Sequence, residues 1–133
     1  EAADRFRQHL LAHPPDTVLV PWRRDPHGDH RATGQLVHRA LAGFPSRPRV
    51  LEYPIWVWAL ARPADWPAAG EVQGWRLDIR DVQTLKQRAI AAHQSQLTEL
   101  IDDDPDGFRL TPAVLTHFEH PWEVFLEALP SVP

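Results

Sequence analysis

The sequence contains no cysteine among its 133 residues. Disulfide frameworks and thiolate metal sites are therefore excluded, and the redox compartment stays open because a chain without thiols tolerates either environment. No apolar run approaches the length that crosses a bilayer, so we expect no membrane span. No charged-then-apolar leader begins the chain, and the cytoplasm is therefore the default prediction for its location.

An excess of positive charge is missing as well. Fourteen lysines and arginines stand against eighteen aspartates and glutamates, which gives a formal net charge of −4. This balance offers no electrostatic footprint for nucleic acid, so we expect no nucleic-acid partner. The length, with 43% apolar and 24% charged residues, is that of an ordinary globule, and residues 1–133 are predicted to form a single domain with a real core.

Apolar spacing predicts an alternation of helices and strands along the chain. The helices are expected at about residues 2–12, 29–44 and 82–101, and the strands at about 17–20, 49–58 and 75–79. The second of these strands is expected to be interrupted or ended at Pro54. A short amphipathic stretch follows around Trp122. This order is typical of an α/β sandwich around a mostly parallel sheet. We therefore expect the fold to be Rossmann-like, represented here by its C-terminal half, with helices flanking the sheet.

The most informative segment is the loop Asp25-Pro26-His27-Gly28-Asp29-His30. It follows the first strand and leads into a helix for which Asp29 is a good N-cap. In open α/β sheets, ligands bind in the crevice at this end of the strands. A neutral imidazole is a good zinc ligand, and a nearby carboxylate fixes the tautomer of a histidine. Asp29 near His27 would also favour the imidazolium form, which can donate to a developing oxyanion.

A structural interpretation of the same segment stays open. Asp29 can simply cap the helix while His27 and His30 lie in water as ordinary loop residues. An open catalytic zinc site takes three protein ligands, and this segment cannot supply three by itself. Any metal site here is therefore incomplete within the segment.

The segment His27-Gly28-Asp29-His30-Arg31-Ala32-Thr33-Gly34 resembles the second signature of the PIG-L/LmbE-like N-deacetylases. The similarity begins at the strand 15–21 and continues through Tyr53-Pro54-Ile55-Trp56 and His93-Gln94-Ser95-Gln96 to Trp122-Glu123-Val124-Phe125, and so covers nearly the whole chain. This resemblance implies a zinc-dependent hydrolase with a Rossmann-like sheet. Its cofactor is Zn²⁺, and its substrate is a small amino-sugar conjugate of the N-acetylglucosamine type, from which it removes the acetyl group.

Carried over by position, the resemblance makes His30 a zinc ligand. It places His27 beside the substrate carbonyl, where it stabilises or protonates the tetrahedral intermediate, and it makes Asp29 the residue that pairs with and orients His27. The family's first signature is an A-H-P-D-D-E run that follows a strand and supplies two more zinc ligands and the general base. This signature is missing here. The run His13-Pro14-Pro15-Asp16 looks similar to it but comes before the strand at 17–20 and not after it. We therefore expect that half to lie outside this chain. The chain alone is expected to be inactive and to expose an apolar sheet edge that favours a homo-oligomer.

Four further side chains are candidates for substrate binding because they lie just beyond strand ends. Trp22 and Trp56 are predicted to form the walls of a sugar pocket, and Arg23 and Arg24 to meet an anionic group, unless the two arginines are a solvated loop pair. His93 lies on the apolar stripe of the last helix, which favours a buried structural role. Two other functions stay open: a non-catalytic or degenerate accessory or carbohydrate-binding module, and a metal phosphohydrolase that uses the same histidines.

Overall fold

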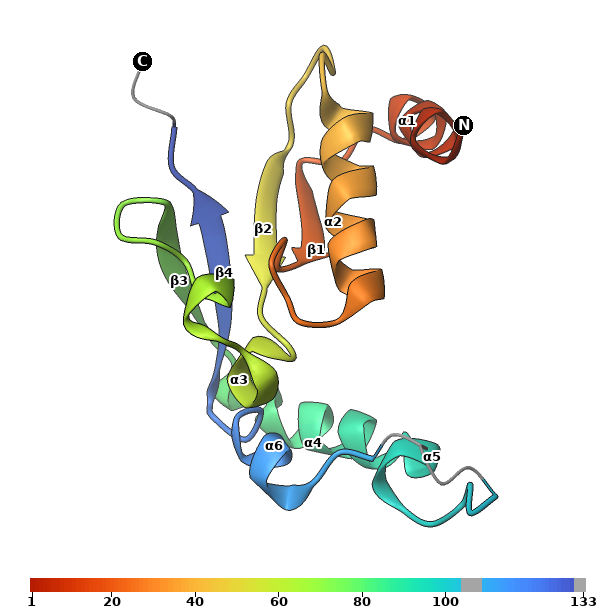
Figure 1. Cartoon of the computed structure of the whole chain (residues 1–133), viewed down its shortest axis with the longest axis vertical. Coiled ribbons are helices and arrows are strands. Elements are labelled where there is room, and N and C mark those ends of the chain that lie inside the picture. The colour runs from red at the N-terminus through yellow and green to blue at the C-terminus, as the bar shows by residue number, and fades with distance from the viewer. Residues whose placement is uncertain (104–108, 131–133) are drawn as a thin grey trace. The chain divides into compact units, whose positions relative to one another are not determined.

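A mixed α/β fold is built on one open sheet of four strands (Figure 1). The structure, a computed structural model, describes residues 1–103 and 109–130. The strands are neighbours in the order β1 (Thr17–Pro21), β2 (Arg49–Tyr53), β4 (Trp122–Ala128) and β3 (Val72–Asp78). β1 and β2 pair in parallel, whereas β2 and β4 pair antiparallel. The sheet is therefore mixed, which corrects the prediction of a mostly parallel one.

The contacts of the chain divide it into two compact units. The first contains Glu1–Trp75 together with the end of the chain from Val124, and the second is Arg76–Glu123. This division does not test the prediction that residues 1–133 form a single domain. In the part of the chain that the structure describes, no helix has both the length and the apolar character needed to span a membrane.

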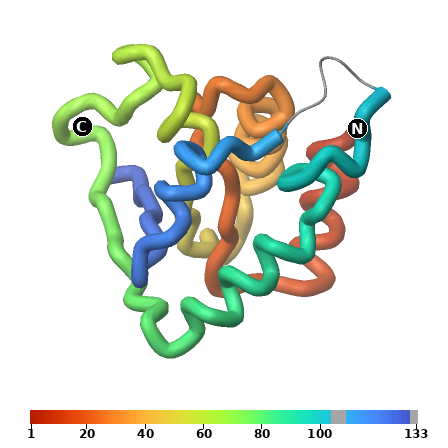
Figure 2. Tube along the Cα trace, turned by 90° about the horizontal axis from the view of Figure 1, so that it is seen from below, coloured from red at the N-terminus to blue at the C-terminus, as the bar shows by residue number. Residues whose placement is uncertain are grey.

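The core of the first unit forms where two helices cover the parallel strand pair. α2 (Gly28–Leu41) packs on β1, and α1 (Ala2–Ala12) packs on α2, as the two views in Figures 1 and 2 show. Burial of apolar side chains from these elements supplies the main stabilising term. The core cluster consists of Leu10, Val20, Val37, Ala40, Leu41 and Phe44.

The ends of these helices follow from local sequence. α1 stops at His13 because two prolines come next and cannot continue a helix. α2 begins after His27, which is its N-cap in place of the predicted Asp29. The chain leaves α2 through Gly43, whose φ of 66° is a left-handed conformation that glycine adopts at little cost.

The structure defines the end of β2 and the nature of the amphipathic stretch around Trp122. β2 ends at Tyr53 because Pro54 has no N–H to donate to the ladder, which confirms the alternative that the strand ends at this proline. Residues 57 and 58 belong instead to the short helix α3 (Val57–Leu60), which is followed by a 3₁₀ turn at Pro63–Asp65. The amphipathic stretch around Trp122 is the interior strand β4.

The second unit contains short helices where the sequence predicts one long one. A 3₁₀ turn at Arg80–Val82 leads into α4 (Gln83–Ala91), which is followed by α5 (Gln94–Leu97) and α6 (Pro112–Thr116). His93 lies in the break between α4 and α5 and is exposed, so its predicted burial is wrong. The apolar stripe of α4 also faces solvent, with Leu85 59% exposed.

Candidate functional site

The candidate site lies in the loop between β1 and α2. The backbone N–H of Trp22 donates to the carbonyl of Tyr53 at 3.0 Å, which extends the pairing of β1 and β2 by one step beyond their carboxyl ends. A turn follows, closed by the N–H of Asp25 donating to the carbonyl of Trp22 at 2.9 Å. The loop therefore starts in the position where open α/β sheets bind ligands.

The carboxylate of Asp25 organises this loop and is completely buried, with 0% of the residue exposed. Its Oδ1 accepts the backbone N–H of His27 at 3.1 Å and lies 3.0 Å from Nδ1 of His30. Its Oδ2 accepts the backbone N–H groups of Ile55 at 3.2 Å and Trp56 at 2.9 Å. A buried carboxylate is stable only with such partners. One side chain thus ties the loop after β1 to the turn after β2.

The contact with Asp25 fixes which nitrogen of His30 is available. Nδ1 faces a carboxylate oxygen, so it carries the proton, and the lone pair of the ring lies on Nε2. Histidines that bind metals commonly donate their other ring N–H to a carboxylate in this way. His30 therefore has the environment of a metal ligand, with Nε2 as the coordinating atom.

His27 is held in the opposite tautomer. As the N-cap of α2, its Nδ1 accepts the backbone N–H of Asp29 at 3.2 Å, so the proton of the ring lies on Nε2. The ring is then a neutral donor rather than the expected imidazolium. The centroids of the His27 and His30 rings are 4.9 Å apart, with 39° between the ring planes. The loop therefore places a hydrogen-bond donor beside a potential metal ligand.

Asp29 orients His27 through its backbone amide, and not through its carboxylate. Within residues 1–103 and 109–130, the Asp29 carboxylate makes no hydrogen bond or ion pair. It is exposed in the first turn of α2, where a negative charge interacts favourably with the helix dipole. The carboxylate that contacts an imidazole here is that of Asp25, and its partner is the ring of His30 and not that of His27.

A complete metal site is not assembled by the described residues. Among them, no group of three or more histidine, cysteine, aspartate or glutamate side chains could hold a metal ion. His30 offers one nitrogen ligand with a supporting carboxylate, and an open catalytic zinc site takes three protein ligands. The donor set thus fits one part of a zinc site.

Trp22 does not form the wall of a substrate pocket, which corrects its predicted role. It is 0% exposed, and its Nε1–H donates to the carbonyl of Asp65 at 2.7 Å. The guanidinium groups of Arg23 and Arg24 lie over its ring, at 5.0 and 4.7 Å from the centroid. These contacts make Trp22 a structural residue beneath the loop.

Arg23 and Arg24 are both engaged in ion pairs, so neither is a solvated loop residue or a free cation. Nε of Arg23 donates to both oxygens of the buried Glu52, at 3.0 and 2.9 Å, and its backbone N–H donates at 3.2 Å. Arg24 donates from its two terminal nitrogens to both oxygens of Glu71, at 2.6 and 2.7 Å. Their predicted role towards an anionic substrate is therefore unsupported by their contacts.

These pairs shift the pKa of both carboxyl groups. Burial raises the pKa of Glu52, but the interactions of its carboxylate with His38 and Arg23 outweigh burial and hold that pKa below its usual value. Hydrogen bonding to Arg24 lowers the pKa of Glu71 from 4.5 to about 2. Both glutamates are thus anions near neutral pH and neutralise the arginines that they face.

Trp56 is the predicted pocket residue whose placement still allows a contact with a ligand. Its backbone N–H is held by Asp25, the same carboxylate that holds His30, and its side chain is partly exposed. Aromatic rings that are partly exposed beside a polar site can stack on apolar faces of a ligand.

No protein-family model matches the chain, and no curated protein shows significant similarity to it. What can be said of function therefore depends on the geometry of the loop and on the sequence motif that it carries. In that geometry, His30 is held by the carboxylate of Asp25, and the ring of His27 lies beside it at the start of α2. Both histidines lie beyond the carboxyl ends of two parallel strands.

Proposed function

We propose that this chain carries part of the active site of a zinc-dependent N-deacetylase of the PIG-L/LmbE-like type. The substrate class is a small amino-sugar conjugate of the N-acetylglucosamine type, and the sheet is part of a Rossmann-like one. The proposed cytoplasmic location and homo-oligomeric state belong to the same hypothesis. The remaining metal ligands and the general base come from polypeptide outside this chain.

The contact between Asp25 and His30 is the observation that carries the proposal. If His30 were an ordinary solvated histidine, its Nδ1 would be hydrogen-bonded to water. Instead, a buried carboxylate lies 3.0 Å from that nitrogen. The contact fixes the tautomer in which Nε2 can coordinate, and it restrains the ring before any ligand arrives. A purely structural role for His30 explains the fixed tautomer and the restrained ring less directly than a role in metal binding does.

His30 would hold zinc through Nε2, and His27 would act on the substrate. When bound, zinc supplies a Lewis acid that polarises the acetyl carbonyl and makes water more acidic. His27 carries its proton on Nε2, so it can donate a hydrogen bond to the carbonyl oxygen as negative charge develops there. The backbone N–H of Asp29 keeps that tautomer in place.

An activity assay on the protein that contains this chain tests the reaction class. We expect acetate release from N-acetylglucosamine conjugates, and His27→Ala is expected to lower turnover by a factor of about 10²–10³ while zinc content is unchanged. His13→Ala is the matched control because His13 is an exposed histidine at the end of α1. Release of phosphate from phosphate esters instead of acetate would contradict the proposal and support a phosphohydrolase. Full activity of His27→Ala would remove His27 from the reaction.

A further inference from the structure

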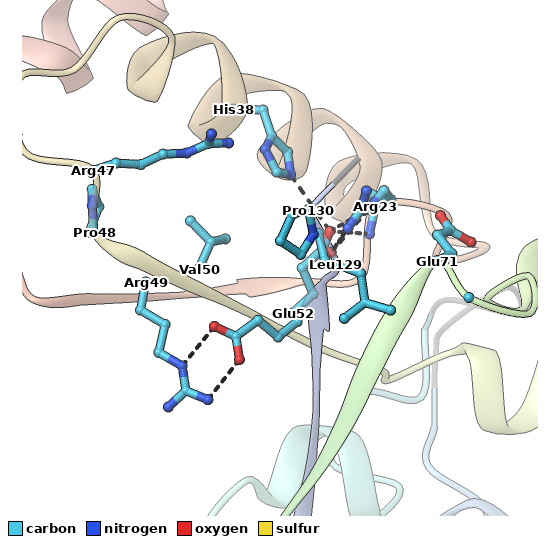
Figure 3. Close-up of a pocket in the computed structure, with 13 residues that line it drawn as sticks. Arg23, His38, Arg47, Pro48, Arg49, Val50, Glu52, Glu71, Leu129 and Pro130 are labelled. Atoms are coloured by element: carbon cyan, nitrogen blue, oxygen red, sulfur yellow. Dashed lines mark hydrogen bonds and ion pairs between the residues drawn. The ribbon is translucent and has the colours of Figure 1, made fainter. Parts of the chain in front are cut away.

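The first unit contains a cavity of about 680 Å³ that the proposed deacetylase site does not use. Its lining comes from α2, β2, the loops after β1, before β2 and before β3, and the end of β4 with the residues that follow it (Figure 3). Neither His27 nor His30 lines it. The volume is in the range of pockets that bind small organic molecules.

Most charges that line the cavity are already neutralised in pairs. Arg23 pairs with Glu52, and Arg49 donates to both oxygens of Glu127 at 2.9 and 2.8 Å. Glu71, the third acid of the lining, is paired with Arg24, as described above. The three carboxylates therefore have no charge left over for a cationic ligand.

Two lining groups, Arg47 and His38, are not held in a hydrogen-bonded pair. Among the residues that the structure describes, Arg47 makes no ion pair or hydrogen bond, and Figure 3 shows its side chain extending along the cavity toward His38. Nε2 of His38 lies 3.7 Å from Oε1 of Glu52, which is within ion-pair range, but at this distance the buried nitrogen makes no hydrogen bond (Figure 3). Because that nitrogen faces a carboxylate, it carries a proton. The cavity thus offers one guanidinium and one imidazole N–H.

We propose that this cavity binds a small organic carboxylate with an apolar body. A carboxylate accepts two parallel hydrogen bonds from a guanidinium, and a second interaction with the N–H of His38 would satisfy a buried donor that otherwise costs stability. The positive charge of Arg47, which has no ion-pair partner among the described residues, matches the single negative charge of a carboxylate ligand. A phosphate dianion would bring a second charge close to the carboxylates of the lining, which disfavours it.

The apolar body of the ligand follows from the rest of the lining. Pro48, Val50 and Leu129 provide carbon surface beside the charged groups. Burial of a hydrocarbon group against them adds affinity in proportion to the apolar area removed from water. A branched aliphatic acid such as 4-methylpentanoate is therefore a suitable probe.

Titration of the protein that contains this chain with 4-methylpentanoate, followed by NMR of the histidine ring nitrogens, tests the proposal. We expect saturable shifts of the His38 resonances, and we expect Arg47→Gln to weaken binding by about tenfold or more, the effect of losing a charge-assisted hydrogen bond. Arg39→Gln is the matched control, since Arg39 is an exposed arginine on α2 that does not line the cavity. It should leave binding unchanged.

Three results would overturn the proposal. The first is equal binding of the uncharged 4-methylpentanamide, because the carboxylate would then be unnecessary. The second is equal affinity of the wild type and Arg47→Gln, with circular dichroism showing both to be folded. The third is saturation of the His38 shifts by inorganic phosphate with no response to the carboxylate.

Discussion

Oδ1 of Asp25 lies 3.0 Å from Nδ1 of His30, five residues later in the first turn of α2. The other oxygen of that carboxylate accepts two backbone N–H groups from the turn after β2. The orientation of His30 therefore depends on a residue that also holds two segments of the chain together. Substitutions of Asp25 should consequently change both the stability of the fold and the affinity of the proposed site for metal.

Replacement of Asp25 by asparagine is expected to destabilise the chain by about 1–3 kcal/mol or more, because an amide cannot accept hydrogen bonds on both sides and leaves buried N–H groups unsatisfied. Urea unfolding followed by tryptophan fluorescence measures this difference. Asp29→Asn is the control, and it should change stability by less than about 0.5 kcal/mol because the Asp29 side chain is exposed. Equal effects of the two substitutions would contradict the organising role of Asp25.

The ion pair between Arg24 and Glu71 predicts a specific dependence of stability on pH. Hydrogen bonding to Arg24 lowers the pKa of Glu71 from 4.5 to about 2 in the folded chain. A lowered pKa means that the unfolded chain binds the proton more tightly. The stabilisation is therefore complete above about pH 4.5 and is lost as the pH falls through about 2. The difference in unfolding free energy between wild type and Glu71→Gln should shrink over that interval, and a constant difference would contradict the pair.

Trp22 is expected to matter for stability and not for substrate affinity. Trp22→Phe leaves a space under the two arginines and removes the donor to the Asp65 carbonyl, which should cost about 1–3 kcal/mol. Trp66→Phe is a suitable control because Trp66 is 40% exposed. Thermal unfolding of the two variants measures the difference, and equal midpoints would show that burial of Trp22 contributes little.

Glu52→Gln should be among the more damaging single substitutions in the first unit. It leaves the guanidinium of Arg23 without its buried partner, and removal of one member of a buried ion pair commonly costs about 3–5 kcal/mol. Arg23 is itself partly exposed, with 29% of its side chain accessible, so we expect a loss at the lower end of that range. Denaturant unfolding at pH 7 measures it. A loss no larger than that of Glu99→Gln, at an exposed ion pair, would contradict this role.

Local sequence was sufficient to predict the elements whose pattern is strong. The spacing of Phe6 and Leu10 predicts α1, and the unbroken apolar run predicts β1, and both are confirmed. The long helix expected over 82–101 is wrong because the apolar stripe continues through residues where the chain turns, at His93. Periodicity alone cannot detect that break.

Interactions between distant segments account for most of what the sequence did not predict. β4 joins the sheet through pairing with β2, some 70 residues earlier in the chain, at Glu52 and Leu126. Arg23 and Arg24 look like free cations in sequence because their partners, Glu52 and Glu71, lie far along the chain. Asp25, by contrast, was within reach of prediction, because it lies only five residues before His30, in the loop that leads into the helix.

Zinc stoichiometry is the most direct test of the central claim. The protein that contains this chain is purified as wild type, His30→Ala, Asp25→Asn and His13→Ala, and bound zinc is measured by mass spectrometry after dialysis against a weak chelator. We predict that His30→Ala loses its zinc, that Asp25→Asn binds it about 10–100-fold more weakly, and that His13→Ala matches the wild type. Stoichiometric zinc in His30→Ala would contradict the assignment of His30 as a ligand and, with it, the proposed hydrolase.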